Sequence, residues 1–413
     1  MATVFHQLSR FTNFAGGFTR YCPTLANGSL YSNEITEANT ELINRTAGTY
    51  SNLYCRVQSG SNAASTVQFR KNTANGNQVL SIGAAASGEF EDTSNTDDVV
   101  DSNTTDISTT GAGSTGTMAF IAVLFSATTD TSQRLGPSGG ETVLGAVKAT
   151  VGYHEMGGFV SDEAIEANAT FDYNTAGTLH NLQVYISAND ISDIFSVTYA
   201  VRKNGANVIT MLVPGMETGS FENYTTDASI AANDDCNFSI SVPAATYGTS
   251  LTHTFIAIDF VTTNKKFHVI LGSDGGWSQA FATSRWNMVS GDAVNTTAEA
   301  GRVEMDTNIQ ATASNLYARV SANTVNNTSS VTLRKNAANS ALTISVASTT
   351  TGSFEDAVNT VALVATDEIN YQFTTTGTAG NITWKITGMM LENIEVSTAV
   401  KDIIQAGIIP FAR

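Results

Sequence analysis

Val331-Thr332-Leu333-Arg334-Lys335-Asn336, with Ala341-Leu342-Thr343-Ile344-Ser345-Val346 shortly after it, is the stretch that decides the fold of this chain. Apolar and polar residues alternate in both segments, which is the period-two pattern of a half-buried strand. The four residues between them, Ala337 to Ser340, are typical of a turn. The pattern predicts a β-hairpin whose first strand ends in an Arg-Lys-Asn triplet.

The hairpin recurs along the sequence. The triplet starts at Arg70, Arg202 and Arg334, so both intervals are 132 residues. An Asn-Leu pair precedes each triplet and a Gly-x-Phe-Glu motif follows it. These motifs lie at Asn52-Leu53, Asn181-Leu182 and Asn315-Leu316, and at Gly88-Glu89-Phe90-Glu91, Gly219-Ser220-Phe221-Glu222 and Gly352-Ser353-Phe354-Glu355. Three landmarks in one order, three times, indicate one module built three times and favour a scaffold or binding array over a single catalytic pocket.

The fold class that follows is all-β, with three tandem antiparallel β-sandwich or jelly-roll-like modules. Each module has room for roughly seven or eight short strands, and the Gly-x-Phe-Glu motif is expected to form a corner. We place an N-terminal arm at 1–27, the modules at 28–130, 148–264 and 288–395, linkers at 131–147 and 265–287, and a C-terminal tail at 396–413.

The two ends of the chain are expected to lie outside the modules and to carry apolar side chains. They pack back on their own modules or dock on partner subunits, since solvating them would be costly. The candidates for partner contact are Phe5, Phe11, Phe14, Phe18, Ile404, Ile408, Ile409 and Phe411.

Composition limits the function. Hydrophobic residues make up 42% of the chain, so each module can build a core, whereas charged residues make up only 14%. The net charge of −17 opposes binding to nucleic acid or to anionic membranes. No apolar leader or membrane-spanning run is seen, and we expect folding in a reducing cytoplasm. Three cysteines without a repeated position indicate no disulfide framework.

No catalytic, cofactor or metal motif stands out. His154-Glu155-Met156-Gly157-Gly158 begins like a zinc-protease motif but lacks the second histidine. The acidic run from Glu91 to Asp106 is more simply a solvated loop than a Ca²⁺ site. Arg70, Arg202 and Arg334 are candidates for a repeated binding surface; the simpler alternative is pairing with the glutamate of the Gly-x-Phe-Glu motif.

The hairpin around Val331–Asn336, with Thr351-Gly352-Ser353-Phe354-Glu355-Asp356, resembles small β-sandwich repeats in virion structural proteins of tailed bacteriophages. The resemblance covers the three modules, and the second departs most. It implies a virion component, either a capsid decoration or cement protein or a part of a fibre or tail, and it brings no catalytic residues. Such a component is expected to fold and assemble in the host cytoplasm and to contact capsid or tail subunits or its own copies.

Three hypotheses follow. The first is a non-enzymatic decoration or cement protein on the outer surface of a capsid. The alternative is a tail fibre or receptor-binding protein that recognises host glycans, which predicts exposed aromatic residues at loop tips. The third, a glycan depolymerase, requires a carboxylate pair in a groove, and the sequence singles out none.

Overall fold

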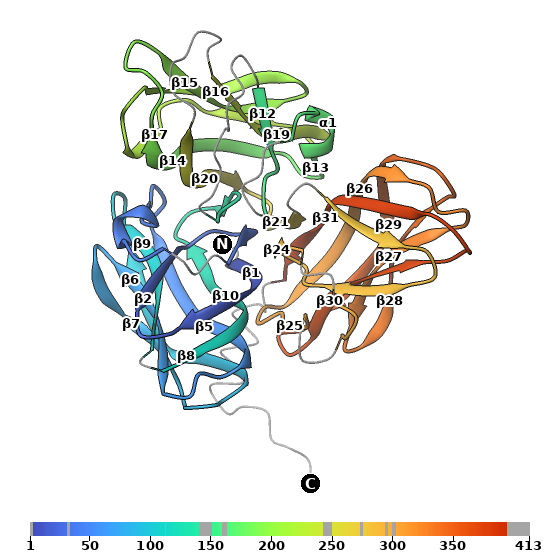
Figure 1. The fold of residues 1–413 in the computed structure, drawn as a ribbon, viewed down its shortest axis with the longest axis horizontal. Helices are drawn as coiled ribbons and strands as arrows, with labels where there is room; N and C mark the ends of the chain where they lie inside the picture. Colours follow the sequence, from blue (N-terminus) through green and yellow to red (C-terminus); the bar gives the residue numbers. More distant parts are fainter. Residues whose placement is uncertain are drawn as a thin grey trace, which may run out of the picture.

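The computed structural model describes residues 3–30, 34–111, 113–139, 151–158, 163–242, 250–272, 276–293, 296–299 and 303–394. Strands dominate this part of the chain, with two short helices, η1 (Glu37–Asn39) and α1 (Glu166–Ala169). The strands form six sheets, two in each of three modules that surround a common centre (Figure 1). The all-β sandwich class predicted from the sequence is confirmed.

Module 1 pairs its strands in the order β1-β10-β5-β8 in one sheet and β2-β9-β6-β7 in the other, with β3 and β4 at the side. Its strands are β1 (Thr3–Ala15), β2 (Thr19–Pro23), β3 (Gly28–Ser29), β4 (Leu42–Ile43), β5 (Gly48–Ser59), β6 (Ser65–Lys71), β7 (Ala74–Ile82), β8 (Gly88–Val99), β9 (Thr104–Gly111) and β10 (Thr115–Ala127). We number the eight main strands of each module as positions 1 to 8 in chain order, which in module 1 are β1, β2 and β5 to β10. In these numbers the two sheets have the strand orders 1-8-3-6 and 2-7-4-5. Two four-stranded sheets connected in this way form a jelly roll.

Modules 2 and 3 repeat this order, as β11-β20-β14-β17 with β12-β19-β15-β16, and as β21-β31-β26-β29 with β23-β30-β27-β28. Module 2 consists of β11 (Thr131–Leu135), β12 (Val151–His154), β13 (Phe171–Tyr173), β14 (Gly177–Asn189), β15 (Ser196–Lys203), β16 (Ala206–Pro214), β17 (Gly219–Asn223), β18 (Ala228–Ile230), β19 (Asp234–Ser241) and β20 (Leu251–Thr262). Module 3 consists of β21 (Lys266–Gly272), β22 (Trp277–Ala280), β23 (Ser284–Asn287), β24 (Gly291–Asp292), β25 (Met305–Asp306), β26 (Ala311–Asn323), β27 (Ser329–Lys335), β28 (Ala338–Val346), β29 (Gly352–Leu363), β30 (Glu368–Thr375) and β31 (Asn381–Asn393).

The module boundaries differ from those drawn on the sequence. Module 1 begins at Thr3, so the segment 1–27, expected to be an arm, supplies β1 and β2 instead. The segments 131–147 and 265–287, expected to be linkers, begin with β11 and β21, the first strands of modules 2 and 3. The physical reason is that the strand at position 8 would otherwise expose unpaired backbone N–H and C=O groups along its outer edge. The strand at position 1 pairs with that edge in antiparallel orientation in all three modules. The connections between modules are only residues 128–130 and 263–265.

Two of the recurring motifs shape the strands themselves. Asn52, Asn181 and Asn315 have φ of 54°, 61° and 51°, and each lies at a register shift in the strand at position 3. Asparagine tolerates this left-handed conformation, so the motif marks a β-bulge. Each Gly-x-Phe-Glu glycine begins the strand at position 6 with φ between 108° and 119°. The expected corner is therefore the start of an edge strand.

The modules share their apolar cores. One cluster of buried side chains runs through modules 1 and 3, and Phe5 packs edge-on against Phe267 with ring centroids 5.4 Å apart. A second cluster, centred on module 2, includes Ala26 of module 1 and Tyr317 and Ile386 of module 3. Burial of a large apolar side chain contributes about 2 kcal/mol, so separating the modules would expose a substantial part of each core.

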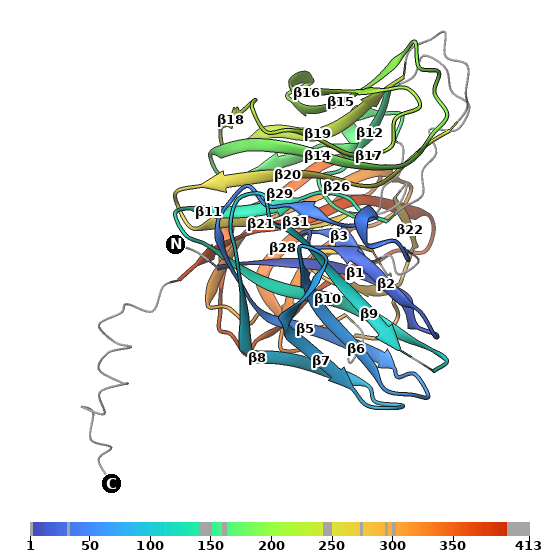
Figure 2. The same cartoon turned by 90° about the vertical axis from the view of Figure 1, so that its left-hand side faces the viewer.

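All three modules point the same way along the central axis. The end of the strand at position 8 lies beside the start of position 1 in each module, as shown by Ser126 opposite Thr3 and Thr262 opposite Thr131. Only three residues connect one module to the next, so the end of position 8 in one module lies close to the start of position 1 in the next module. Figure 2 shows the strands of the modules from the side. We call the end with residues 128–130 and 263–265 the linker end, and the opposite one the free-loop end.

Glycines allow the modules to approach at the centre. A Cβ on Gly291, which has φ of +90°, would contact Ser9 Oγ and lie 2.7 Å from Gly28 O. Gly158, also with φ of +90°, would place a Cβ 2.8 Å from Gly272 Cα. Backbone of one module therefore packs directly on backbone of another, where no side chain fits.

Gly291→Ala is expected to lower the free energy of unfolding by about 2–5 kcal/mol, because left-handed strain and overlap add. Gly352→Ala is the matched control in the same module: it has φ of +119° but no atom within 4 Å of the added Cβ, and should cost about 1–2 kcal/mol. Urea unfolding of both variants measures the difference. Equal losses would contradict close backbone packing at the centre.

Candidate functional site

The three arginines proposed as a repeated surface are held inside their own modules. Arg70 Nε and Nη2 donate to the two carboxylate oxygens of Glu37 at 2.6 and 2.8 Å. The same two-point pairing joins Arg202 to Glu166 and Arg334 to Glu299. Each guanidinium also donates to the asparagine five residues on and to the backbone carbonyl three residues on. These contacts fix the hairpin tip, so the arginines are tied to the architecture.

The predicted pairing with the Gly-x-Phe-Glu glutamate is wrong. The partners Glu37, Glu166 and Glu299 lie 33, 36 and 35 residues before their arginines. A recurring Glu-Ala dipeptide marks all three positions and is visible in the sequence, but it is too short to be recognised as a motif without the pairing.

The other two residues of the triplet have equally repeated roles. Lys71, Lys203 and Lys335 each donate from Nζ to a backbone carbonyl 26 or 27 residues further on. The asparagines adopt φ of 50–51°, and their side-chain oxygens accept the backbone N–H at the start of the strand at position 7. The whole triplet therefore stabilises the tip of the hairpin against the neighbouring strands.

The apolar candidates for partner contact fall into three groups. Phe5 is buried in the core shared with module 3, so its neighbour is another module of the same chain. Phe18 is 61% exposed at the free-loop end. Phe11 and Phe14 lie in β1, but their side chains are outside the described residues. Ile404, Ile408, Ile409 and Phe411 are outside the described residues altogether.

The module interfaces form a cyclic series. The short strand that follows position 2 in each module (β4, β13 or β25) docks on the strands at positions 3 and 6 of the next module. At the first interface, the Gln183 side chain accepts from Ile43 N at 3.1 Å and donates to Ile43 O at 2.7 Å. Arg45 pairs there with Glu222 at both carboxylate oxygens and with Asp101. This interface combines opposite charges.

The second and third interfaces use different side chains at equivalent positions. Between modules 2 and 3, Asn174 Nδ2 donates to Glu355, and Phe171 packs edge-on against Tyr317. Between modules 3 and 1, Arg56 Nη1 donates to Glu304 O and to Glu89 Oε1, both at 2.8 Å. Heterologous contacts that run in one direction close into a ring when the rotation between units is suitable.

Amide side chains hold the centre of the ring together. Gln133 pairs with both the N–H and the C=O of His268 in β21, at 3.0 and 2.6 Å. Asn27 Oδ1 accepts from Ile270 N at 3.0 Å on the same strand. Modules 1 and 2 thus satisfy the backbone of the first strand of module 3, which would otherwise be a buried unpaired edge.

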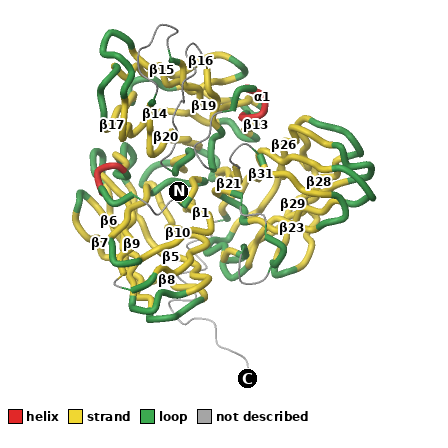
Figure 3. The backbone as a smooth tube through the Cα atoms, in the orientation of Figure 1, coloured by secondary structure: helices red, strands yellow, loops and turns green. Residues whose placement is uncertain are grey.

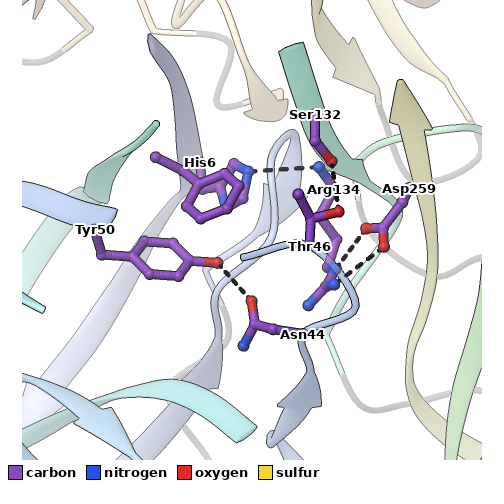
Figure 4. A pocket seen from close by; sticks show the side chains of 8 residues that line it. His6, Asn44, Thr46, Tyr50, Ser132, Arg134 and Asp259 are labelled. Carbon is purple, nitrogen blue, oxygen red and sulfur yellow. Dashed lines mark hydrogen bonds and ion pairs between the residues drawn. The ribbon is translucent and has the colours of Figure 1, made fainter. Parts of the chain in front are cut away.

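A small buried chamber lies between modules 1 and 2 (Figure 4). Its volume of about 10 Å³ suits a single water molecule. Arg134 Nε and Nη2 donate to Asp259 at 2.7 and 3.2 Å, and both side chains are at most 5% exposed. Burial acts to raise the pKa of Asp259, but the charge and hydrogen bonds of Arg134 outweigh it and hold that pKa below its ordinary value. Burial, then the charge of Arg134, lowers the pKa of nearby His6 to about 3.

These groups suit a structural role. A histidine with a pKa of about 3 is neutral at physiological pH and has little basicity to offer a reaction. Burial likewise lowers the pKa of His268 to about 3 and raises the thiol pKa of the buried Cys22, Cys55 and Cys236 well above its ordinary value. A second, open groove of about 450 Å³ adjoins the chamber at the linker end, and Arg45, Asp130, His180 and Asp227 are among the residues that line it.

The comparisons with known proteins are these. No family model and no curated protein matches the chain. Among solved structures, a protein reported under "The Triple Jelly Roll Fold and Turret Assembly in an Archaeal Virus" aligns over 94% of this chain and 91% of its own at 12% identity and a TM-score of 0.17. A protein from the atomic structure of Sulfolobus turreted icosahedral virus covers 95% and 92% at 12% identity and a TM-score of 0.18. The VP2 subviral particle of infectious bursal disease virus covers 97% and 83% at 10% identity and a TM-score of 0.17.

We assign the jelly-roll fold from the strand order of the three modules and not from these alignments, because their TM-scores are too low. Within the part of the chain that the structure describes, no helix is long and apolar enough to span a membrane.

Asp259→Asn should lower the free energy of unfolding by about 3–5 kcal/mol, because it leaves Arg134 buried without its counter-charge. Glu37→Gln, which removes one partner of a more exposed ion pair, is the control and should cost about 1 kcal/mol. Since the folded-state pKa of Asp259 is lowered, the contribution of this pair is present above pH ~4 and is lost as the pH falls through that pKa. Urea unfolding at pH 7 that gives equal losses for both variants would contradict the structural role.

Proposed function

We propose that this protein is a non-enzymatic structural subunit of a bacteriophage virion, placed on the outer surface of the capsid as a decoration or cement protein. The observation that carries the proposal is the uniform direction of three jelly rolls around one axis. One chain thereby forms a three-lobed unit with two different end faces. A protein that lies on a capsid needs such a difference, because one face contacts the capsid and the other contacts solvent. Acidity fits a position away from the packaged nucleic acid.

The two end faces differ in chemistry. The described loops between positions 3–4, 5–6 and 7–8 in modules 1 and 3 contain no charged residue, and those in module 2 contain Asp190, Asp193 and Glu217. The linker end carries the three Arg-Lys-Asn tips with their acidic partners. Such polarity allows one face to rest on a particle while the other meets solvent.

The segment 396–413 is the proposed contact with neighbouring subunits, since it carries the apolar residues Ile404, Ile408, Ile409 and Phe411. The N-terminal segment is not a comparable test, because its removal would delete β1 and β2. The decisive experiment on location is electron microscopy of labelled particles: density on the tail alone would overturn the capsid assignment.

The triple variant Ile404→Ser/Ile408→Ser/Phe411→Ser should abolish incorporation into particles and leave the melting temperature within about 2 °C, because the modules retain their cores. Lys401→Ser/Gln405→Ser changes polar residues of the same segment and is the control. Particle incorporation is measured on purified virions. Wild-type incorporation of the triple variant would show that the tail is not the contact.

A receptor-binding role for host glycans is the second candidate, and one observation favours it. Phe18 and Phe281 are exposed aromatic residues, 61% and 39%, on the loops between positions 1 and 2 at the free-loop end of modules 1 and 3. Aromatic rings at loop tips offer stacking faces for sugar rings.

On that candidate, Phe18→Ala/Phe281→Ala should reduce binding to host cells at least about tenfold, since each lost stacking contact costs on the order of 1 kcal/mol. Ile194→Ala, an exposed residue at the same end, should leave binding unchanged. Cell binding and a glycan array are the measurements. Binding that does not depend on the two phenylalanines excludes this surface.

A further inference from the structure

The three interfaces of the ring are equivalent in geometry but unequal in charge. The second residue of the docking strand is Ile43 in β4, Asp172 in β13 and Asp306 in β25. Its cross-strand neighbour at position 7 is Thr104, Asp235 and Glu368 respectively. The first interface therefore has uncharged residues where the other two place a pair of carboxylates side by side, an arrangement that repels when both are ionised.

The third interface adds another carboxylate. Glu89 of β8 faces Asp306 across the junction of modules 3 and 1, and carboxylate oxygens of Glu89, Asp306 and Glu368 all lie within 4.8 Å of one another. We call these three residues the closing cluster. Arg56 of β5 is the cation that contacts it, through Glu89 at 2.8 Å.

Among the residues that the structure describes, the other charged groups around the closing cluster are acidic. Glu304, at the start of the docking segment, repels Glu368, and Glu91 of β8 and the buried hydroxyl of Tyr54 also face this junction. In this part of the chain the Arg56 guanidinium therefore faces three carboxylates with further acidic neighbours. Carboxyl groups this close repel one another when all are ionised, which favours a proton on one of them.

The second interface contains a milder version. Asp172 and its cross-strand neighbour Asp235 both belong to module 2, and Glu355 of β29 and Arg319 of β26 are charged groups that face Asp172 from module 3. Tyr317 of β26 and Cys236 of β19 are the other titratable neighbours. Ser353 occupies the position in the Gly-x-Phe-Glu motif that Glu89 has in module 1. The 2–3 junction therefore has a serine where the 3–1 junction has the carboxylate of Glu89, and comparison of the two junctions shows the effect of that carboxylate.

We propose that a proton closes the ring at the junction of modules 3 and 1: Glu89 and Asp306 share it across the junction, and raising the pH loosens this junction while the 1–2 junction stays shut. Removing the shared proton leaves like charges in contact across the docking strand. The junction of modules 1 and 2 has Arg45 of module 1 against Glu222 of module 2 instead, and retains its attraction.

The direction of the pH effect follows from the pKa values. Burial, then the hydrogen bond with Asp306, raises the pKa of Glu89 from 4.5 to about 8, and burial, then the hydrogen bond with Asp235, raises that of Asp172 from 3.8 to about 8. The folded state therefore binds more protons than the unfolded state between these values. Stability from these groups is complete below pH ~4 and is lost as the pH rises toward about 8. This sign is opposite to that of Asp259.

The proposal concerns junctions within one chain and does not depend on the virion role. Glu89→Gln is the central variant, because an amide keeps the shape and cannot ionise. Wild-type protein should melt at a lower temperature at pH 8.5 than at pH 5.5, and the variant should lose the part of this difference that comes from the 3–1 junction, by gaining stability at pH 8.5. Glu217→Gln, an exposed carboxylate at the free-loop end, should keep the wild-type profile.

A local measurement identifies the junction. Hydrogen exchange at pH 8, compared between variants at that one pH, should be slower in β25 and β8 of Glu89→Gln than of wild type by at least about tenfold, the equivalent of one pKa unit. Exchange in β4 should not change. Ser353→Glu builds the third carboxylate at the 2–3 junction and should speed exchange in β13 at pH 8.

Several results would overturn the proposal. They are a wild-type melting temperature that rises or stays level from pH 5.5 to 8.5, a Glu89→Gln profile that follows wild type, and faster exchange in β25 of that variant. If Glu89→Gln fails to fold, Ser353→Glu still tests the idea, since unchanged exchange in β13 at pH 8 contradicts it.

Discussion

The antiparallel pairing between positions 8 and 1 is the constraint on which the rest of the structure depends. The strand at position 8 is largely buried, and its outer edge must be paired by the strand at position 1. Position 1 of modules 2 and 3 begins only three residues after position 8 of the preceding module. A connection that short allows no change of direction along the axis, so all three jelly rolls share one polarity, and the difference between the two end faces follows from connectivity alone.

Glycine and amide chemistry complete the ring that the short connections begin. Three sheets meet at the central axis by their edges. The backbone N–H and C=O groups of these edges need hydrogen-bond partners, and there is no space for side chains where the backbones of two modules touch. Gln133 and Asn27 supply the partners on β21, while Gly158 and Gly291 remove the side chains. These contacts join modules without extending a sheet, so each jelly roll keeps eight strands.

The sequence predicts what repeats and fails where the modules meet. The hairpin, the all-β class and the number of modules are visible because alternation and the triplet recur three times. The sequence does not predict β1, because its apolar residues, such as Phe5 and Phe14, show no strict alternation around the register shift between Ser9 and Thr12. Glu37 was missed because its pairing with Arg70 joins segments 33 residues apart through a two-residue motif. The interface charges are even less accessible, since nothing in the sequence indicates which modules are neighbours on which face.

Repetition and divergence therefore serve different purposes in this chain. Contacts that stay within one module are almost copied: arginine to glutamate, lysine to a carbonyl, asparagine to the next strand. Contacts between modules are not copied, and Ile43, Asp172 and Asp306 occupy one geometric position with two kinds of chemistry. A homotrimer could not vary its three interfaces independently, because symmetry would impose one residue on all of them. Fusion of the modules into one chain removes that restriction, and one junction can pair opposite charges while another brings carboxylates together.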